Sequence, residues 1–237
     1  MTIVRNLDED AEATRGLAEI FSAYYRSNSW GDDETVSGVG SRLNSTVNLR
    51  AQLPSLFEQF EIKSILDAPC GDHNWFSHVE RGDITYLGID IVPELVEQNR
   101  RRYGDQNTDF IPLDITREPL PAADLMICRD LLAHLSFKDI GRIFKNILNS
   151  DVKYLLFTHH HECHGNNDAY SGGYRPLNLE LFPFDFPEPL LDIDDWREDQ
   201  RPRKMCLWET SSSASQINEM ATILLNIRSH VTVHPPA

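Results

Sequence analysis

The sequence is short of basic residues. It contains 22 Lys and Arg against 37 Asp and Glu, which gives a formal net charge of −15 over 237 residues. A field of this sign repels phosphate backbones, so we expect no nucleic-acid partner. The densest basic runs, at 100–102 and 201–204, are short, and we predict that both lie on the solvated surface.

Cysteine is also scarce, and long apolar runs are absent. The four cysteines, at positions 70, 128, 163 and 206, form no CxxC pair, which is typical of reduced thiols in a cytosolic protein. No apolar run approaches the roughly 18 residues that a membrane span needs. The acidic N-terminal region has no apolar signal segment. We therefore expect a cytoplasmic protein without a membrane span.

Apolar segments with strand character alternate with amphipathic helical segments through the middle of the chain. Such alternation predicts an α/β fold with a mostly parallel sheet and helices on both faces. In such sheets, ligands bind at the carboxyl ends of the strands, near the point where the strand order reverses. Strands are predicted at 63–68, 85–91, 110–113, 124–128, 153–158, 190–193 and 205–208, and helices at 74–79, 94–103 and 137–148.

Helical patterns flank this core. Apolar residues at helical spacing occur at 11–25 and 49–60 before the first strand, and at 214–227 after the last. A stretch rich in His, Asn, Gly and Pro follows the fifth strand. We predict a helical N-terminal extension or lid at 1–61, a core at 62–210 with an insertion at 159–188, and a C-terminal helix with a disordered tail at 211–237.

Acidic residues end the first two strands of the core. Asp67 and Asp90 are 23 positions apart, and an acid at the tip of the second strand suits hydrogen bonding to a ribose diol. A dinucleotide site would need three glycines after the first strand, but only Gly71 is present there. Asp67 and Asp72 would also repel a pyrophosphate. S-adenosylmethionine (SAM) has no phosphate and carries an ammonium and a sulfonium, so nearby carboxylates suit it better.

Four segments at the strand ends resemble the ordered motifs of class I SAM-dependent methyltransferases. They are Asp-Ala-Pro-Cys-Gly at 67–71, Gly-Ile-Asp at 88–90, Leu-Asp-Ile at 113–115 and Ala-Asp-Leu-Met-Ile-Cys at 123–128. The resemblance implies a Rossmann-like seven-stranded methyltransferase sheet, mostly parallel with the last strand antiparallel, and SAM as cofactor. It implies that Asp90 binds the ribose and Asp114 the adenine amino group. The predicted cofactor-binding residues are Asp67, Cys70, Gly71, Asp90, Ile91, Asp114, Ile115 and Arg129.

The flanking segments resemble a narrower bacterial group associated with O-methylation of sugars and polysaccharides. They are Gly-Val-Gly-Ser at 38–41, Arg-Asp-Leu-Leu-Ala-His at 129–134 and Gly-Gly-Tyr-Arg-Pro-Leu-Asn at 172–178. This resemblance implies methyl transfer to a hydroxyl of a saccharide. We also expect the upstream Ser/Gly segment, with Arg50, to cover the methionine end of SAM.

A sugar hydroxyl is not ionised at neutral pH, so its methylation benefits from a general base. We expect the base after the fourth or fifth strand: His134 or His159, with Asp130 orienting it or binding a substrate hydroxyl. The residues predicted to bind the acceptor are His160, Tyr174, Arg175 and Asn178.

Several alternatives stay open at this point. A divalent metal such as Mg²⁺ could be held by Asp130, His159 and His161. The acceptor could instead be another small molecule, such as a natural product or a phosphorylated metabolite, and the chain could be an inactive SAM-binding regulatory protein. A homodimer is also open. For Trp30 and Trp208 we predict core packing alone.

Overall fold

The computed structural model describes residues 16–196 and 201–227. The start of the first predicted helix and the tail predicted at 230–237 lie outside these residues. In the part of the chain that is described, no helix has the length and apolar character to cross a membrane.

The core is a seven-stranded sheet with the order β3-β2-β1-β4-β5-β7-β6. Six strands are parallel, and β7 runs antiparallel to its neighbours β5 and β6. The predicted fold class is therefore confirmed. The strands are β1 (Ser64–Asp67), β2 (Thr85–Asp90), β3 (Thr108–Pro112), β4 (Ala123–Cys128), β5 (Val152–His159), β6 (Leu191–Asp194) and β7 (Lys204–Glu209).

The strand order reverses at β1, which has β2 on one side and β4 on the other. Asp67, the last residue of β1, pairs with Gly88 and with Ile127. The carboxyl ends of these three strands therefore lie next to each other, where the reversal opens a crevice in folds of this class.

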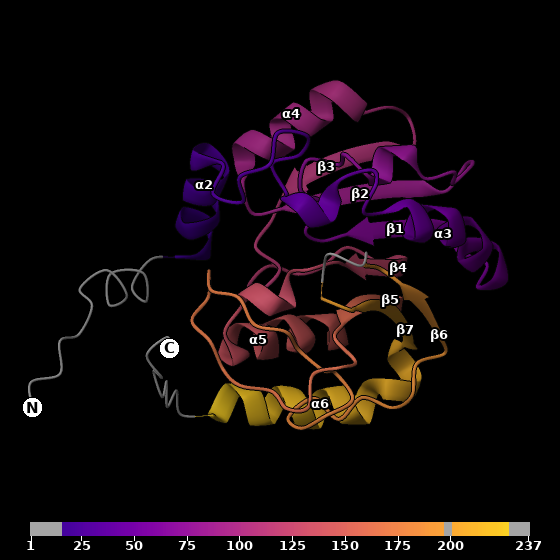
Figure 1. The fold of residues 1–237 in the computed structure, drawn as a ribbon. Coiled ribbons are helices and arrows are strands. Elements are labelled where there is room, and N and C mark those ends of the chain that lie inside the picture. Colours follow the sequence, from indigo (N-terminus) through magenta and orange to yellow (C-terminus); the bar gives the residue numbers. More distant parts are fainter. Residues whose placement is uncertain (1–15, 197–200, 228–237) are drawn as a thin grey trace, which may run out of the picture.

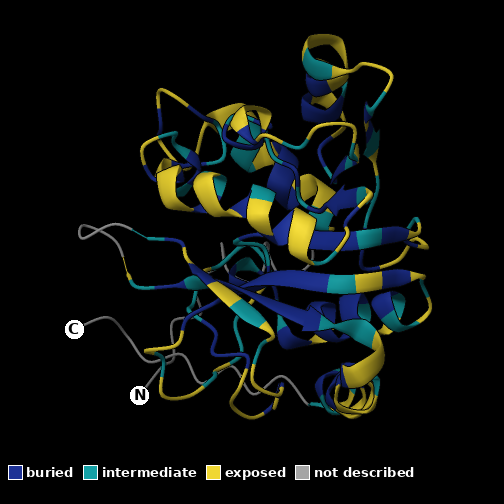
Figure 2. Cartoon of the chain, turned by 90° about the vertical axis from the view of Figure 1, so that its right-hand side faces the viewer, coloured by how far each residue is buried: buried dark blue, intermediate teal, exposed yellow. Residues whose placement is uncertain are grey.

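Helices cover both faces of the sheet, as Figure 1 shows. The central strands are accordingly apolar on both sides: Ile65 and Leu66 are both buried, yet they belong to two different core clusters. The outer faces of the helices are exposed, while the strands between them are buried (Figure 2). The helices are α2 (Leu17–Ser27), α3 (Val47–Gln59), α4 (Pro93–Tyr103), α5 (Phe137–Leu148) and α6 (Thr210–Asn226).

Local sequence explains where several helices begin. Pro93 takes the first position of α4, where a missing N–H costs nothing. Ser136 caps α5 by accepting a hydrogen bond from the Asp139 N–H at 3.2 Å. The helix predicted at 74–79 is only a 3-10 turn at Phe76–His78. Gly71 and His73 both have positive φ, at 53° and 57°, so the chain turns sharply before a helix can form.

The insertion after β5 contains no helix or strand between residues 160 and 190. It is nevertheless fixed to the sheet. The Nδ1 of His159 accepts a hydrogen bond from the Leu179 N–H, and the Trp208 indole donates to the Pro187 carbonyl. Phe184 is fully buried against Phe137. The insertion therefore forms part of the layer that packs with α5.

Candidate active site

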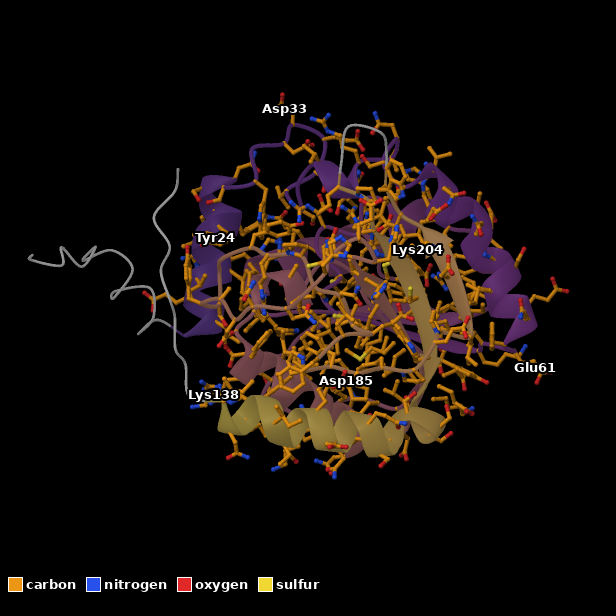
Figure 3. All side chains as sticks on the ribbon, turned by 60° about the horizontal axis from the view of Figure 1, so that its bottom comes forward. Tyr24, Asp33, Glu61, Lys138, Asp185 and Lys204 are labelled. Carbon is orange, nitrogen blue, oxygen red and sulfur yellow. The ribbon has the colours of Figure 1, made fainter. Side chains whose placement is uncertain are left out.

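A cavity of about 710 Å³ opens at the carboxyl ends of β1, β2 and β4, within the size range of small-molecule sites. Its floor is made by the strand ends and the loop after β3. Its other walls come from α2, the segment 36–41, the loop after β4, the residues 172–174 of the insertion, and Arg203 before β7. Tyr24, labelled on α2 in Figure 3, lines one wall, and Lys204, next in the chain to Arg203, is labelled on β7.

Asp67 lies on the floor and is buried. Its Oδ2 accepts a hydrogen bond from the Tyr86 hydroxyl at 2.6 Å, whereas its Oδ1 is buried with no partner. Burial raises the pKa of Asp67 to about 7, although the Tyr86 hydroxyl and the positive charge of Arg129 act to lower it. A buried oxygen without a hydrogen-bond partner lowers the stability of the fold. Asp67 Oδ1 is therefore an acceptor that a donor group of a bound ligand could satisfy.

Asp90 holds the turn that follows β1. Its Oδ2 accepts from the Gly71 N–H at 3.1 Å, and its Oδ1 accepts from the Val92 N–H at 3.0 Å. Burial raises the pKa of Asp90 to about 6. Each oxygen can accept a second hydrogen bond, so the carboxylate can still serve a ligand's hydroxyl groups.

The other predicted cofactor residues also line the cavity: Cys70, Ile91, Asp114, Ile115 and Arg129. Asp114 is held by the Thr116 hydroxyl at 2.6 Å. Cys70 is buried, and its Sγ lies 3.7 Å from the Asn99 amide nitrogen.

The segment 36–41 lies directly over the turn after β1. The Val36 N–H and the Ser37 hydroxyl donate to the two carboxylate oxygens of Asp72, at 3.0 and 3.2 Å. Gly71 has a φ of 53°, and a Cβ there would collide with Ser37 Oγ. Only glycine therefore allows this approach. Arg50, by contrast, does not line the cavity: it donates to the Leu43 carbonyl.

Arg129 joins the same segment to the far edge of the sheet. Its guanidinium makes two hydrogen bonds to Asp195, at 2.8 and 3.0 Å, and a third to the Gly40 carbonyl at 2.7 Å. Its charged group also lies over the Trp75 ring, 5.4 Å from the centroid. Both members of the ion pair are buried, so Arg129 forms a fixed wall of the cavity.

The prediction that the basic run 201–204 lies on the solvated surface is wrong for Arg203. Its side chain is only 11% exposed and lies between Asp195, at 3.2 Å, and Asp130, at 3.4 Å. The two carboxylates hold it inside the protein, because a guanidinium can be buried only with counter-charges. Its Nη2 has no hydrogen-bond partner.

Asp130 follows β4 in a left-handed conformation, with φ 60°. Its N–H donates to the Thr158 hydroxyl at 2.8 Å, and its carboxylate faces the cavity wall. Burial is the largest influence and raises its pKa, but Arg203, Arg129 and two nearby histidines lower the pKa of Asp130 to about 2. Asp130 is therefore ionised at neutral pH.

His134 lines the cavity beside Asp130. Its Nδ1 lies 2.7 Å from the Gly173 carbonyl oxygen, so Nδ1 carries the proton and Nε2 is the basic nitrogen. Nε2 has no protein partner among the described residues. Burial lowers the pKa of His134 below its usual range, and this outweighs the opposing effects of Gly173 and Asp130. The ring is thus neutral, with its lone pair available.

Two aromatic side chains flank His134. The Trp30 ring centroid lies 6.2 Å from that of His134, and the Tyr174 centroid lies 5.3 Å from it. Trp30 is 36% exposed and lines the cavity, so the prediction that it packs in the core is wrong. Trp208 is buried in the core as predicted.

Comparisons with known proteins agree with this geometry. Residues 65–150, from β1 to just beyond α5, match the model of a family described as a methyltransferase domain. No curated protein sequence gives a match.

Three solved structures are similar to this chain. A SAM-dependent methyltransferase of Leishmania major is 15% identical, with a TM-score of 0.61 over 84% of this chain and 89% of that one. Magnesium protoporphyrin IX methyltransferase from Synechocystis PCC 6803, with bound SAH, is 11% identical, with a TM-score of 0.58 over 81% and 98%. Human N-acetylserotonin methyltransferase in complex with SAM is 18% identical, with a TM-score of 0.45. That match covers 71% of this chain but only 55% of the human protein.

The matched domain contains every strand end that forms the cavity floor. The chain contains a methyltransferase domain at residues 65–150. Two features of this methyltransferase fit its cofactor. The unpartnered Oδ1 of Asp67 can accept from an ammonium group, and the glycine at 71 keeps the floor free of a side chain.

Two predicted base and acceptor residues of the methyltransferase lie away from the cavity. His159 and His160 are buried at the end of β5 and do not line it. Their Nδ1 atoms accept hydrogen bonds from the N–H groups of Leu179 and Leu177, at 3.1 and 3.2 Å. Burial lowers the pKa of each ring to about 4, so both are neutral groups that hold the insertion.

The side chains of Arg175 and Asn178 donate hydrogen bonds to backbone carbonyls and do not line the cavity. Arg175 donates to the Leu132 carbonyl at 2.9 Å, beneath the 3-10 turn Leu132–His134. Asn178 donates to the Cys163 carbonyl at 2.9 Å. Of the four predicted acceptor residues, Tyr174 alone lines the cavity.

The three residues considered for a metal are not brought together. Within 16–196 and 201–227, no group of three His, Cys, Asp or Glu side chains could hold a metal ion. His159 and His161 have ring centroids 6.5 Å apart, and Asp130 pairs with arginines instead.

Proposed function

We propose that this methyltransferase transfers a methyl group to a hydroxyl of a saccharide, with His134 as the general base. The observation that carries the proposal is the hydrogen bond from His134 Nδ1 to the Gly173 carbonyl. It fixes the tautomer and leaves Nε2 basic, in a cavity that also contains the turn after β1.

SAM supplies a methyl group activated by its sulfonium. As the methyl group moves from SAM to an acceptor hydroxyl, His134 Nε2 would take the proton of that hydroxyl. Asp130, held ionised by Arg203 and Arg129, accepts a hydrogen bond from a second hydroxyl and stabilises the imidazolium that forms.

The wall around His134 supports a saccharide acceptor. Trp30 and Tyr174 are exposed aromatic residues whose rings lie next to the histidine. Asp130 and Arg203 supply an acceptor and a donor for hydroxyl groups at the same wall. A few polar groups beside aromatic surface suit a ligand with alternating C–H faces and hydroxyls.

The fold alone leaves the acceptor open, since the similar structures named above include a magnesium protoporphyrin IX methyltransferase. The test is methyl transfer from radiolabelled SAM to a panel of neutral saccharides, natural-product phenols and sugar phosphates. We expect label in the neutral saccharides. Label only in phenols or phosphates would replace the proposed acceptor class, and no transfer to any acceptor would favour a regulatory SAM-binding protein.

For the cofactor, we propose that Asp90 binds the ribose hydroxyls and that Asp67, Asp114 and the turn at Gly71 complete the SAM site. Asp90→Ala removes the ribose acceptor and also frees the Gly71 and Val92 N–H groups. We expect SAM affinity, measured by calorimetry, to fall at least about 100-fold. Asp109→Ala, an exposed acid on β3 away from the cavity, is the control and should bind SAM normally. Unchanged affinity in Asp90→Ala would contradict the assignment.

A further inference from the structure

Two buried residues behind the cavity floor form a hydrogen-bonded chain that ends on Asp67. The Tyr86 hydroxyl donates to Asp67 Oδ2 at 2.6 Å. Since its only proton is used there, Tyr86 Oη accepts from His73 Nδ1, which lies 3.0 Å away. The chain of donors therefore runs from His73 through Tyr86 to the carboxylate.

We propose that Tyr86 and His73 are positioning residues that hold the carboxylate of Asp67 ionised and oriented for the ammonium group of SAM. This rests on the cofactor role proposed for Asp67. Tyr86 and His73 do not line the cavity themselves, so they act through Asp67.

The surroundings of the chain are apolar, which strengthens it. Tyr86 is 2% exposed and His73 is 4% exposed. The His73 ring packs against Phe76, Tyr103 and Phe110, with centroids 4.9 to 5.7 Å away. Hydrogen bonds in series polarise one another in such a dry environment. His73 also adopts a positive φ of 57°, which among non-glycine residues is most readily adopted by Asn, Asp and His.

The two carboxylate oxygens of Asp67 differ in their hydrogen bonding. Oδ2 is bound by Tyr86, which fixes the plane of the carboxylate. Oδ1 is left buried and without a partner. A carboxylate held by one oxygen presents the other in a defined direction, so binding an ammonium there needs no reorganisation of the side chain.

The charges that face Asp67 decide how this arrangement responds to pH. Asp90 raises the pKa of Asp67, whereas Arg129 and the Tyr86 hydrogen bond lower it. The thiols of Cys70 and Cys128 remain neutral because burial raises their pKa. Burial and Arg81 lower the pKa of His73 to about 3, so its ring is neutral and donates through Nδ1 only.

Asp67 must be ionised to pair with an ammonium, so SAM affinity rises as pH increases through the pKa of Asp67. Without the Tyr86 hydroxyl, ionisation of Asp67 is disfavoured further, and this acid limb moves to higher pH. The alkaline limb reflects the amino group of SAM itself, near pH 8, and is common to all variants.

The experiment is calorimetric titration of SAM between about pH 6 and about pH 9, with no acceptor present. For Tyr86→Phe we expect about tenfold weaker binding at neutral pH, as for loss of a charge-assisted hydrogen bond, and an acid limb displaced upward. For His73→Asn, which retains a residue tolerant of positive φ, we expect a smaller loss with the same direction of shift. Tyr103→Phe removes a hydroxyl from the same aromatic cluster without touching Asp67, and it should behave as wild type.

A wild-type pH profile and affinity in a folded Tyr86→Phe variant would overturn the inference. Should Tyr86→Phe fail to fold, His73→Asn decides in the same way. The proposed function fails separately: it falls if the wild-type protein does not bind SAM, or if His134→Gln retains turnover, and neither result depends on Tyr86.

Discussion

Replacing His134 by glutamine is expected to lower kcat about 10²- to 10⁴-fold, the usual contribution of a general base. The glutamine amide can still donate to the Gly173 carbonyl that now receives Nδ1–H, so the local structure is retained while the basic nitrogen is lost. SAM affinity should not change, because His134 is no part of the proposed cofactor site.

The pH dependence of the reaction provides a second test of His134 as the general base. The pKa of His134 lies below its usual value of 6.5, chiefly because of burial. A base must be deprotonated to act, so kcat/KM for the acceptor, measured at saturating SAM, should rise with pH through this lowered pKa in the wild-type protein and level off before neutrality. The rise should be absent from the residual activity of His134→Gln.

His159→Gln is the matched control, since it changes a histidine that holds the insertion and does not line the cavity. We expect it to lower stability and to leave the kcat of the folded protein near wild type. If His159→Gln loses turnover and His134→Gln retains it, the base has been assigned to the wrong histidine.

The largest expected effect on stability comes from Asp195→Ala. Asp195 is 1% exposed and is the counter-charge for two buried guanidiniums, those of Arg129 and Arg203. Removing one partner of a buried ion pair leaves an uncompensated charge, which costs about 3–5 kcal/mol. Thermal unfolding should shift downward by about 10 °C in a chain of this size.

Asp192→Ala on β6 is the control for this result. Asp192 pairs with Lys204 at 2.7 Å, but both side chains are partly solvent-exposed, at 43% and 28%. Exposed ion pairs contribute about 0–1 kcal/mol, so the control should unfold near the wild-type temperature. Equal shifts in the two variants would show that the buried cluster does not contribute to stability as argued.

The floor of the site could be predicted from the sequence because it depends on local order along the chain. A strand, then an acid, then a glycine places a carboxylate and an open turn at the edge of a parallel sheet. Asp67 and Gly71 follow this rule, Asp90 and Asp114 lie at or just after the ends of the next two strands, and all four line the cavity.

The walls could not be predicted in this way, because they depend on which distant segments meet. Arg203 belongs to a basic run that is typical of a surface, and only the pairing of β6 with β7 places it near Asp195 and Asp130. Trp30 is a large apolar residue in a polar segment, and a tryptophan is equally typical of core packing. His159 and His160 have the residue type expected of a base, but they end β5 with their rings toward the insertion.

The ion pair between Arg129 and Asp195 sets a minimum length for any working fragment. Arg129 lies within the matched region 65–150, but its counter-charge lies at 195 and its carbonyl partner lies at residue 40. A protein trimmed to the matched region would keep the strand ends that form the floor, yet it would expose a guanidinium without its carboxylate and leave the turn at Gly71 uncovered. Deletion from either side of the domain should therefore abolish binding before it removes any residue of the floor.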